Sequence, residues 1–211
     1  RRWEEVITHT PCGSGKLTIL AKLESIDGPL GVLGSSKVLL INNGCKGIAF
    51  TGEIKLDTAD IDHLETQGLF EDVVLHEMGH TVGVGTLWEL PFGDCSTCGS
   101  TGSPTWGCPA LIEEYTDLLG DDAASTDVTD IIELEGGTGT ACGHLDESIF
   151  QTELMTGTIS AVQVSPLSKL TAASLEDIGY LVDPSKVDAY TLPATGASLS
   201  SGEDVLKLSA V

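Results

Sequence analysis

Two histidines one helical turn apart, with a glutamate beside the first, form the segment of this sequence best suited to chemistry. The segment reads His76-Glu77-Met78-Gly79-His80. Residues four positions apart project from the same face of a helix, so the two imidazoles can bind one Zn²⁺ ion together. Glu77 would lie next to that ion, where its carboxylate can take a proton from water. The pattern therefore predicts a hydrolytic zinc site with His76 and His80 as ligands and Glu77 as the catalytic base.

The sequence around this segment has the periodicity of an amphipathic helix. Phe70, Val74, Met78 and Val82 recur at every fourth position and predict one apolar stripe. The alternative is a chance pair of histidines on a core helix, but unliganded His and Glu side chains are costly to bury in so apolar a helix. Gly83 then supplies the tight turn that the longer zinc-peptidase signature requires after its second histidine. These features favour the metal site.

A catalytic zinc site normally has three protein ligands, so a third ligand is needed. The longer signature has a histidine at position 86, where this sequence has Thr86. The remaining candidates are His9, His63 and His144 and, as in another zinc-peptidase branch, Glu113 or Glu114. No motif surrounds the first two histidines or the two glutamates. His144 has better support, because Met155 follows it in the segment Glu-Leu-Met-Thr-Gly.

The rest of the chain predicts a mixed α and β domain. Apolar, β-branched runs between turn residues predict strands, and helical periodicity with capping residues predicts helices. The expected strands are residues 37–42 and 47–56, and the expected helical segments are residues 58–68, 69–83, 110–120 and 165–179. In the last helix, Ser165 is the expected N-cap and Gly179 the stop. Residues 91–143 are rich in turn residues, and we expect an inserted, mostly irregular lobe there.

Acidic residues greatly outnumber basic ones, with 32 Asp and Glu against 10 Lys and Arg and a formal net charge of −22. No lysine or arginine lies between Lys55 and Lys169, a stretch that contains the whole histidine motif. Such a surface repels nucleic acid and anionic membranes and favours neutral or basic partners. If these acids line the cleft of a peptidase, substrates with Lys or Arg near the cleaved bond should be preferred, and the preference should weaken with added salt. The simpler interpretation is a hydrated surface suited to salty or acidic surroundings.

The six cysteines form an even set, which favours disulfides in an oxidising, secretory location. They are Cys12, Cys45, Cys95, Cys98, Cys108 and Cys142. Their connectivity cannot be deduced from the sequence. The alternative is that Cys95 and Cys98 form half of a zinc knuckle, with Cys108 and Cys142 as the only further ligands.

No apolar run approaches the length needed to span a bilayer. The first ten residues lack the apolar core of a signal peptide, and residues 195–211 offer nothing for a lipid-anchor signal. Asp121, Asp122 and Asp127 could hold calcium, but an acid cluster alone is weak support. We expect a monomer that is secreted or extracellular, or held at the cell surface in a longer precursor.

The motifs together resemble the leishmanolysin family of metallopeptidases, a branch of the metzincins. The resemblance rests on HEMGHTVG, followed after a long insertion by GHLDESIFQTELMTG and SPLSKLTAASLEDIGY. RRWEEVI and FTGEIKLDTADIDHLE are also similar to this family, so most of the chain is covered. In this family the third histidine is displaced by an insertion, so Thr86 marks the position where the insertion begins.

The resemblance implies an α+β, metzincin-like zincin fold that forms one catalytic domain. Residues 1–86 would form an N-terminal subdomain with a twisted mixed sheet and the active-site helix. Residues 87–211 would form a C-terminal subdomain with the insertion (about 91–143), the third histidine, the methionine turn and the last helix. The strand in residues 49–56 would form the upper edge of the cleft, where an extended peptide could pair with it.

The resemblance also implies roles for individual residues. His76, His80 and His144 would bind one zinc ion, Glu77 would be the general base, and Met155 would pack beneath the metal without binding it. The chain would then be a zinc-dependent endopeptidase acting on proteins or peptides. An alternative is a secreted acidic binding or adhesion module with a structural zinc site, and a third is a hydrolase of non-peptide amides.

Overall fold

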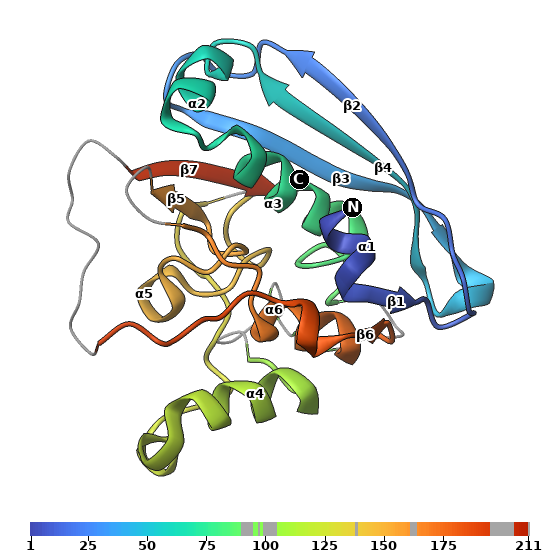
Figure 1. Ribbon diagram of the computed structural model, residues 1–211, viewed down its shortest axis with the longest axis vertical. Helices are drawn as coiled ribbons and strands as arrows, with labels where there is room; N and C mark the ends of the chain where they lie inside the picture. Colours follow the sequence, from blue (N-terminus) through green and yellow to red (C-terminus); the bar gives the residue numbers. More distant parts are fainter. Residues whose placement is uncertain are drawn as a thin grey trace.

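The helix that carries the two histidines lies against one face of a twisted sheet (Figure 1). The computed structural model describes residues 1–89, 95–96, 98, 105–137, 139–160, 164–194 and 205–210. The first residues of the predicted insertion, Pro-Phe-Gly-Asp at positions 91–94, and much of the turn-rich passage after them lie outside the described residues. The described chain contains both helices and strands, so the expectation of a mixed α and β fold is confirmed.

The larger sheet has five strands in the order β2-β4-β3-β7-β5. These strands are β2 (Thr18–Glu24), β3 (Val32–Asn42), β4 (Ile48–Asp57), β5 (Thr158–Ser160) and β7 (Val205–Ala210). The sheet is mixed, because β2 with β4 and β3 with β7 are parallel pairs, whereas β3 with β4 and β5 with β7 are antiparallel. A smaller antiparallel sheet joins β1 (Ile7–His9) to β6 (Leu181–Val182).

The two predicted strands are confirmed within β3 and β4, but the predicted role of residues 49–56 as a free edge is wrong. β4 lies between β2 and β3 and is paired on both sides. Its backbone N–H and C=O groups are therefore engaged within the sheet, so a peptide cannot add to it. The side of β3 away from β4 faces β7 instead.

The helices match most of the predicted ones. They are α1 (Arg2–Val6), α2 (Ile61–Gln67), α3 (Phe70–Val82), α4 (Pro109–Leu119), α5 (Glu147–Phe150) and α6 (Lys169–Asp177), with short 3₁₀ turns η1 (Asn43–Cys45), η2 (Gly120–Ser125) and η3 (Pro184–Lys186). α2, α3 and α4 confirm the expected helical segments before residue 120. η2 and α4 are the regular elements within the described part of the predicted insertion.

The last helix begins later than predicted. Its N-cap is Ser168, whose hydroxyl accepts a hydrogen bond from the Leu170 N–H, so the assignment of Ser165 as N-cap is wrong. The residues just before Ser168 have other partners: the Pro166 carbonyl accepts from Leu154, and the Leu167 N–H donates to Asp188. These bonds hold the segment outside the helix.

α3 separates two apolar clusters. One lies between α3 and the sheet and includes Leu33, Leu56 and Val73; the other lies on the far side and includes Trp88, Leu145, Phe150 and Met155. The buried face of α3 differs from the predicted apolar stripe. His76, Glu77 and His80 are fully buried, whereas Phe70, Val74 and Met78 are only partly buried. The helix therefore buries its polar motif within the protein.

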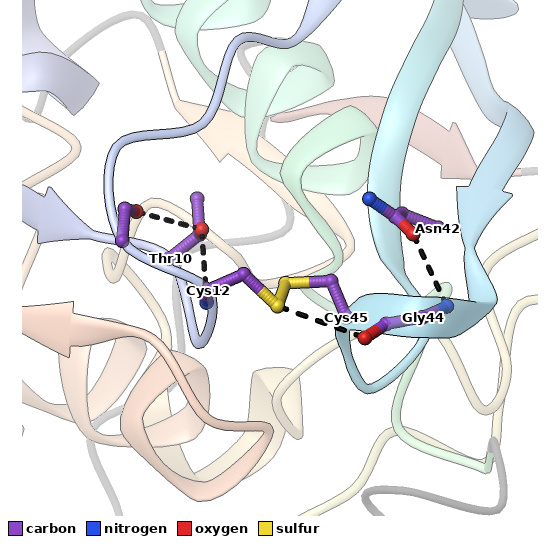
Figure 2. Close-up of a disulfide and its surroundings, with 6 residues drawn as sticks. Thr10, Cys12, Asn42, Gly44 and Cys45 are labelled. Carbon is purple, nitrogen blue, oxygen red and sulfur yellow. Dashed lines mark hydrogen bonds between the residues drawn. A yellow bond between two sulfur atoms is a disulfide. The ribbon is translucent and has the colours of Figure 1, made fainter.

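All six cysteines form disulfides, so the zinc-knuckle alternative is wrong and the disulfide prediction is confirmed. The pairs are Cys12–Cys45, Cys95–Cys108 and Cys98–Cys142. Figure 2 shows the first pair, which ties the segment after β1 to the turn between β3 and β4. In that turn the Asn42 side chain accepts from the Gly44 N–H at 3.1 Å.

Among the described residues, no helix combines the length and the apolar character needed to cross a bilayer.

Asp177, at the end of α6, holds the start of α4 in place. Its carboxylate accepts hydrogen bonds from the N–H groups of Ala110 and Leu111, at 2.8 and 3.0 Å, and from the Trp106 indole at 3.2 Å. The first two donors are unpaired groups of the first helical turn. A negative charge at that end also suits the dipole of α4.

We predict that Asp177→Ala lowers the free energy of unfolding by about 2–3 kcal/mol, because it removes a helix cap and leaves partly buried N–H groups without partners. Asp177→Asn should cost less, since it keeps one accepting oxygen. Urea unfolding followed by circular dichroism measures the difference. Asp117→Ala, at an exposed position of α4, is the matched control and should change stability little. Equal stability of the Asp177 and Asp117 variants would contradict the capping role.

Candidate metal centre

Three imidazole rings face one another in the interior of the protein. The Nε2 atoms of His76 and His80 lie 2.9 Å apart, and each lies 3.1 Å from Nε2 of His144. All three side chains are fully buried. Among the described residues, these histidines are the one group of three or more His, Cys, Asp or Glu side chains placed to hold a metal ion. The structure thus brings together the three histidines selected from the sequence.

Each ring is fixed by a backbone carbonyl at its other nitrogen. Nδ1 of His76 lies 2.6 Å from the Leu154 oxygen, and Nδ1 of His80 lies 2.9 Å from the Val84 oxygen. Nδ1 of His144 lies 2.8 Å from the Thr140 oxygen. A carbonyl oxygen can only accept, so each Nδ1 carries the proton and donates it. Each Nε2 therefore presents a lone pair toward the other two.

Burial keeps these rings neutral. It lowers the pKa of His76 to about 3, with help from neighbouring His144, and lowers the pKa of His144 to about 4. Burial and the two neighbouring rings also lower the pKa of His80 well below its ordinary value. Three neutral imidazoles with converging lone pairs repel one another unless a cation lies between them.

The spacing fits zinc. Two nitrogens bound to one tetrahedral zinc ion at about 2.0–2.1 Å lie roughly 3.3 Å from each other. The three Nε2 separations, 2.9 to 3.1 Å, are close to this value. Neutral imidazole nitrogen is also a preferred zinc donor. The donor set and its spacing therefore suit one zinc ion with an open coordination position.

Glu77 is a buried carboxyl beside this group. It is fully buried, and neither carboxyl oxygen has a hydrogen-bond partner among the described residues. Burial raises the pKa of Glu77 to about 8, although the nearby Ser36 hydroxyl lowers that pKa by a smaller amount. Backbone packs closely against it, since a Cβ added at Gly34 would lie 3.0 Å from Glu77 Oε1. A buried carboxyl without partners is costly and marks a group available for a ligand or for water.

Met155 packs against α3 at the glycine of the histidine motif. It is fully buried. A Cβ added at Gly79 would lie 2.6 Å from the Met155 sulfur and 2.9 Å from the Trp3 ring. Gly79 therefore provides the space in which Met155 and Trp3 pack against the helix between His76 and His80.

Two glycines shape the turn after α3. Gly83 ends the helix with φ of 134°, after which the Val84 carbonyl accepts from His80. Gly85 has φ of 74°, and a Cβ there would lie 2.0 Å from the Gly143 oxygen. Only a residue without a side chain allows the segment that carries His144 to approach so closely. The Cys98–Cys142 disulfide ties down the same segment.

The arrangement can be compared with known proteins. A family model described as leishmanolysin, a peptidase family, matches residues 45–196. The match covers more than half of the chain and includes α3, His144, Met155 and α6. The chain belongs to the leishmanolysin family. A comparison with curated proteins finds no match.

Membership in the leishmanolysin family confirms the resemblance inferred from the motifs. It supports a metallopeptidase, and the three histidines form a group that could hold the zinc ion on which leishmanolysins depend. The other candidate ligands do not join this group. His9 lies in β1, His63 in α2, and Glu113 and Glu114 in α4. Asp121, Asp122 and Asp127 likewise form no metal-binding group among the described residues.

Thr86 has a structural contact in place of a ligand role. Its hydroxyl donates to the His80 carbonyl at 2.6 Å. The resemblance to leishmanolysins implies that the insertion begins at Thr86, and this contact holds the chain close to α3 where it leaves the helix.

Glu153 is a residue whose importance the sequence reasoning missed. Its buried carboxylate accepts from the Met155 N–H at 2.6 Å and from the hydroxyls of Ser168 and Thr171, each at 2.6 Å. The Met155 N–H and the Leu154 carbonyl belong to one peptide group, and that carbonyl accepts the proton of His76 Nδ1. Glu153 thus fixes the peptide that orients His76. Its place two residues before Met155 was the available signal.

We predict that Glu153→Gln lowers the free energy of unfolding by about 2–4 kcal/mol, because an amide cannot accept all of these buried donors. Urea unfolding of the metal-free protein measures the change without any contribution from a bound ion. Glu176→Gln, at an exposed position of α6, makes the same chemical change and should alter stability by less than about 0.5 kcal/mol. Matching curves for the two variants would show that Glu153 does not hold this turn.

Proposed function

We propose that this leishmanolysin-family chain is a zinc-dependent endopeptidase. In this proposal His76, His80 and His144 bind one zinc ion, and Glu77 is the general base. The observation that carries the proposal is the convergence of three neutral Nε2 lone pairs beside a buried carboxyl that has no partner among the described residues. No other described group of side chains offers that donor set.

The three histidines and Glu77 would have separate roles in peptide hydrolysis. A zinc ion bound at the three histidines would supply Lewis-acid chemistry, which polarises a carbonyl and makes water easier to deprotonate. Glu77 would take the proton of the attacking water and later transfer it to the leaving amine nitrogen. Burial raises the pKa of Glu77 in the metal-free protein. A zinc cation beside the carboxyl would lower that pKa and so favour the carboxylate form, which accepts the proton. The three carbonyl contacts at Nδ1 would keep the histidines in the tautomer that can bind metal.

The finer features of a metzincin-like fold belong to the same proposal. Met155 would support the metal site from below without binding the ion, as its packing against Gly79 allows. Gly83 would supply the exit turn from the active-site helix. Residues 1–86 and 87–211 would form the two subdomains around the cleft. Because β7 joins β3, the C-terminal part of the chain also contributes to the larger sheet.

Extracellular action also belongs to the proposal. Three disulfides are consistent with an oxidising compartment. We propose a secreted or extracellular monomer that acts on proteins or peptides. The preference for Lys or Arg near the cut remains a prediction that substrate profiling at two salt concentrations can test.

We predict that Glu77→Ala reduces proteolysis by about 100- to 10,000-fold while zinc remains bound, because the variant loses a proton acceptor and keeps all three imidazoles. Casein or peptide cleavage measures the first effect, and metal analysis of the dialysed protein measures the second. Glu71→Ala, an exposed position in the first turn of the same helix, is the matched control and should retain activity. Full activity of Glu77→Ala would remove Glu77 from the mechanism.

The alternative function, an acidic binding module with a structural zinc site, makes a different prediction for metal removal. A structural site prefers a closed shell of four ligands, whereas the described residues provide three. We therefore predict that chelation abolishes casein cleavage, leaves the circular dichroism spectrum unchanged, and is reversed by added zinc. Unfolding on chelation, in a protein that showed no cleavage beforehand, would favour the structural role.

A further inference from the structure

β7 lies between β3, which contacts Glu77 through Gly34, and β5, which follows the segment beside His144. It pairs with β3 on one side, with Ser209 opposite Ser35 and Ala210 opposite Ser36. It pairs with β5 on the other side. In Figure 1 this strand, drawn in red, runs along the sheet and ends beside α3. The pairs at Ser209 and Ala210 place the end of β7 next to the part of β3 that meets Glu77.

The β3 side of this arrangement reaches the catalytic candidate. Gly34 lies against the Glu77 carboxyl, and the Ser36 hydroxyl lies near it. Since Ala210 pairs with Ser36, the last described residues of β7 lie one strand away from Glu77.

The opposite side reaches the third histidine. The Leu208 N–H donates to the Gly157 oxygen at 3.0 Å, and the Leu208 oxygen accepts from the Thr140 hydroxyl at 3.3 Å. The Thr140 carbonyl accepts the proton of His144 Nδ1. Gly157 also lies beside the ring, because a Cβ added there would be 4.0 Å from His144 Cγ. Of the two partners of the Leu208 backbone, Thr140 therefore holds the His144 ring directly and Gly157 lies next to it.

β7 thus spans the centre from the Glu77 side to the His144 side. Its two described side chains are buried, with Leu206 4% and Leu208 1% exposed. They pack in the apolar cluster that includes Leu33, Val73 and Ile159. His76, Glu77, His80 and His144 have no exposed surface in this structure. A folded protein or a peptide cannot reach a site with no exposed surface.

We propose that residues 205–210 are an intramolecular ligand, paired between β3 and β5 in the position that an extended peptide substrate takes when β7 is displaced. The inference rests on the proposed function. A strand in this position gains main-chain hydrogen bonds on both sides, and side chains two residues apart enter the same apolar cluster. The substrates are accordingly extended peptides with apolar side chains at alternate positions, as at Leu206 and Leu208. β7 must leave before such a peptide reaches Glu77, so the fraction of molecules with β7 displaced limits the rate.

The test uses the full chain with Leu206→Asp and Leu208→Asp combined. Two carboxylates in the apolar cluster oppose docking of β7. If β7 is displaced in about a tenth of the unaltered molecules or fewer, its release should raise kcat/KM for an extended apolar peptide by about tenfold or more. Leu20→Asp with Leu23→Asp adds the same charges to exposed positions of β2 and should leave the rate unchanged. An unchanged or lower rate for the β7 variant, with zinc bound and the fold intact, would overturn the inference.

A second measurement on the unaltered chain covers the case in which that variant does not fold. A peptide hydroxamate with leucine at alternate positions is added to the zinc-loaded protein, and amide hydrogen exchange is followed. The amides of residues 206–210 should lose protection when the peptide binds, while those of β2 and β4 remain protected. Binding of the peptide with β7 still protected would overturn the inference and leave the peptidase proposal standing. Absence of zinc-dependent cleavage in every form would instead remove the proposed function, and this inference with it.

Discussion

The burial of three neutral imidazoles and one carboxyl at a single point is the constraint on which the rest of the structure depends. Each imidazole donates its Nδ1 proton to a backbone carbonyl, from Leu154, Val84 or Thr140. These bonds fix the tautomer of each ring and direct the lone pair of each Nε2 to a common centre. Lone pairs that converge in an apolar interior are unfavourable alone, and a cation removes the repulsion. The leishmanolysin family match includes these residues, and the zinc-peptidase proposal rests on them.

The three carbonyls come from three separate parts of the chain, and the fold must hold all of them. Val84 follows α3 directly, and Gly83 and Gly85 give the turn the shape it needs. The Thr140 segment is held by the Cys98–Cys142 disulfide and by its approach to Gly85. Leu154 belongs to a turn fixed by the buried Glu153 carboxylate, which also joins the start of α6. α3 lies between two apolar clusters, so small shifts of the helix are resisted from both sides.

The sequence was most informative where the chemistry itself limits the choice of residue. His76, His80 and Gly83 could be placed because metal binding and the turn after it allow few alternatives, and His144 could be paired with Met155 through the family motif. The apolar stripe of α3 was confirmed only in part: Val82 is buried, and Phe70, Val74 and Met78 are partly buried and pack against the core. The most buried face is the one with the polar motif, because the protein covers the histidines on that side. Ser168 was missed as the cap because Ser165 followed by Pro166 also fits the start of a helix, and the bonds that hold Pro166 and Leu167 outside the helix come from distant segments. β2 gave no signal because six of its seven residues are exposed, and β7 because its pairing with β3 is set by contacts distant in the chain.

An anomalous difference map recorded at the zinc absorption edge, from crystals grown with zinc, tests most directly whether one ion joins these histidines. The expected result is a single strong peak about 2.0–2.1 Å from Nε2 of His76, His80 and His144, with Glu77 adjacent and not bound. A peak shared by His76 and His80 alone, with His144 turned away toward other partners, would contradict the three-histidine centre and the peptidase proposal built on it.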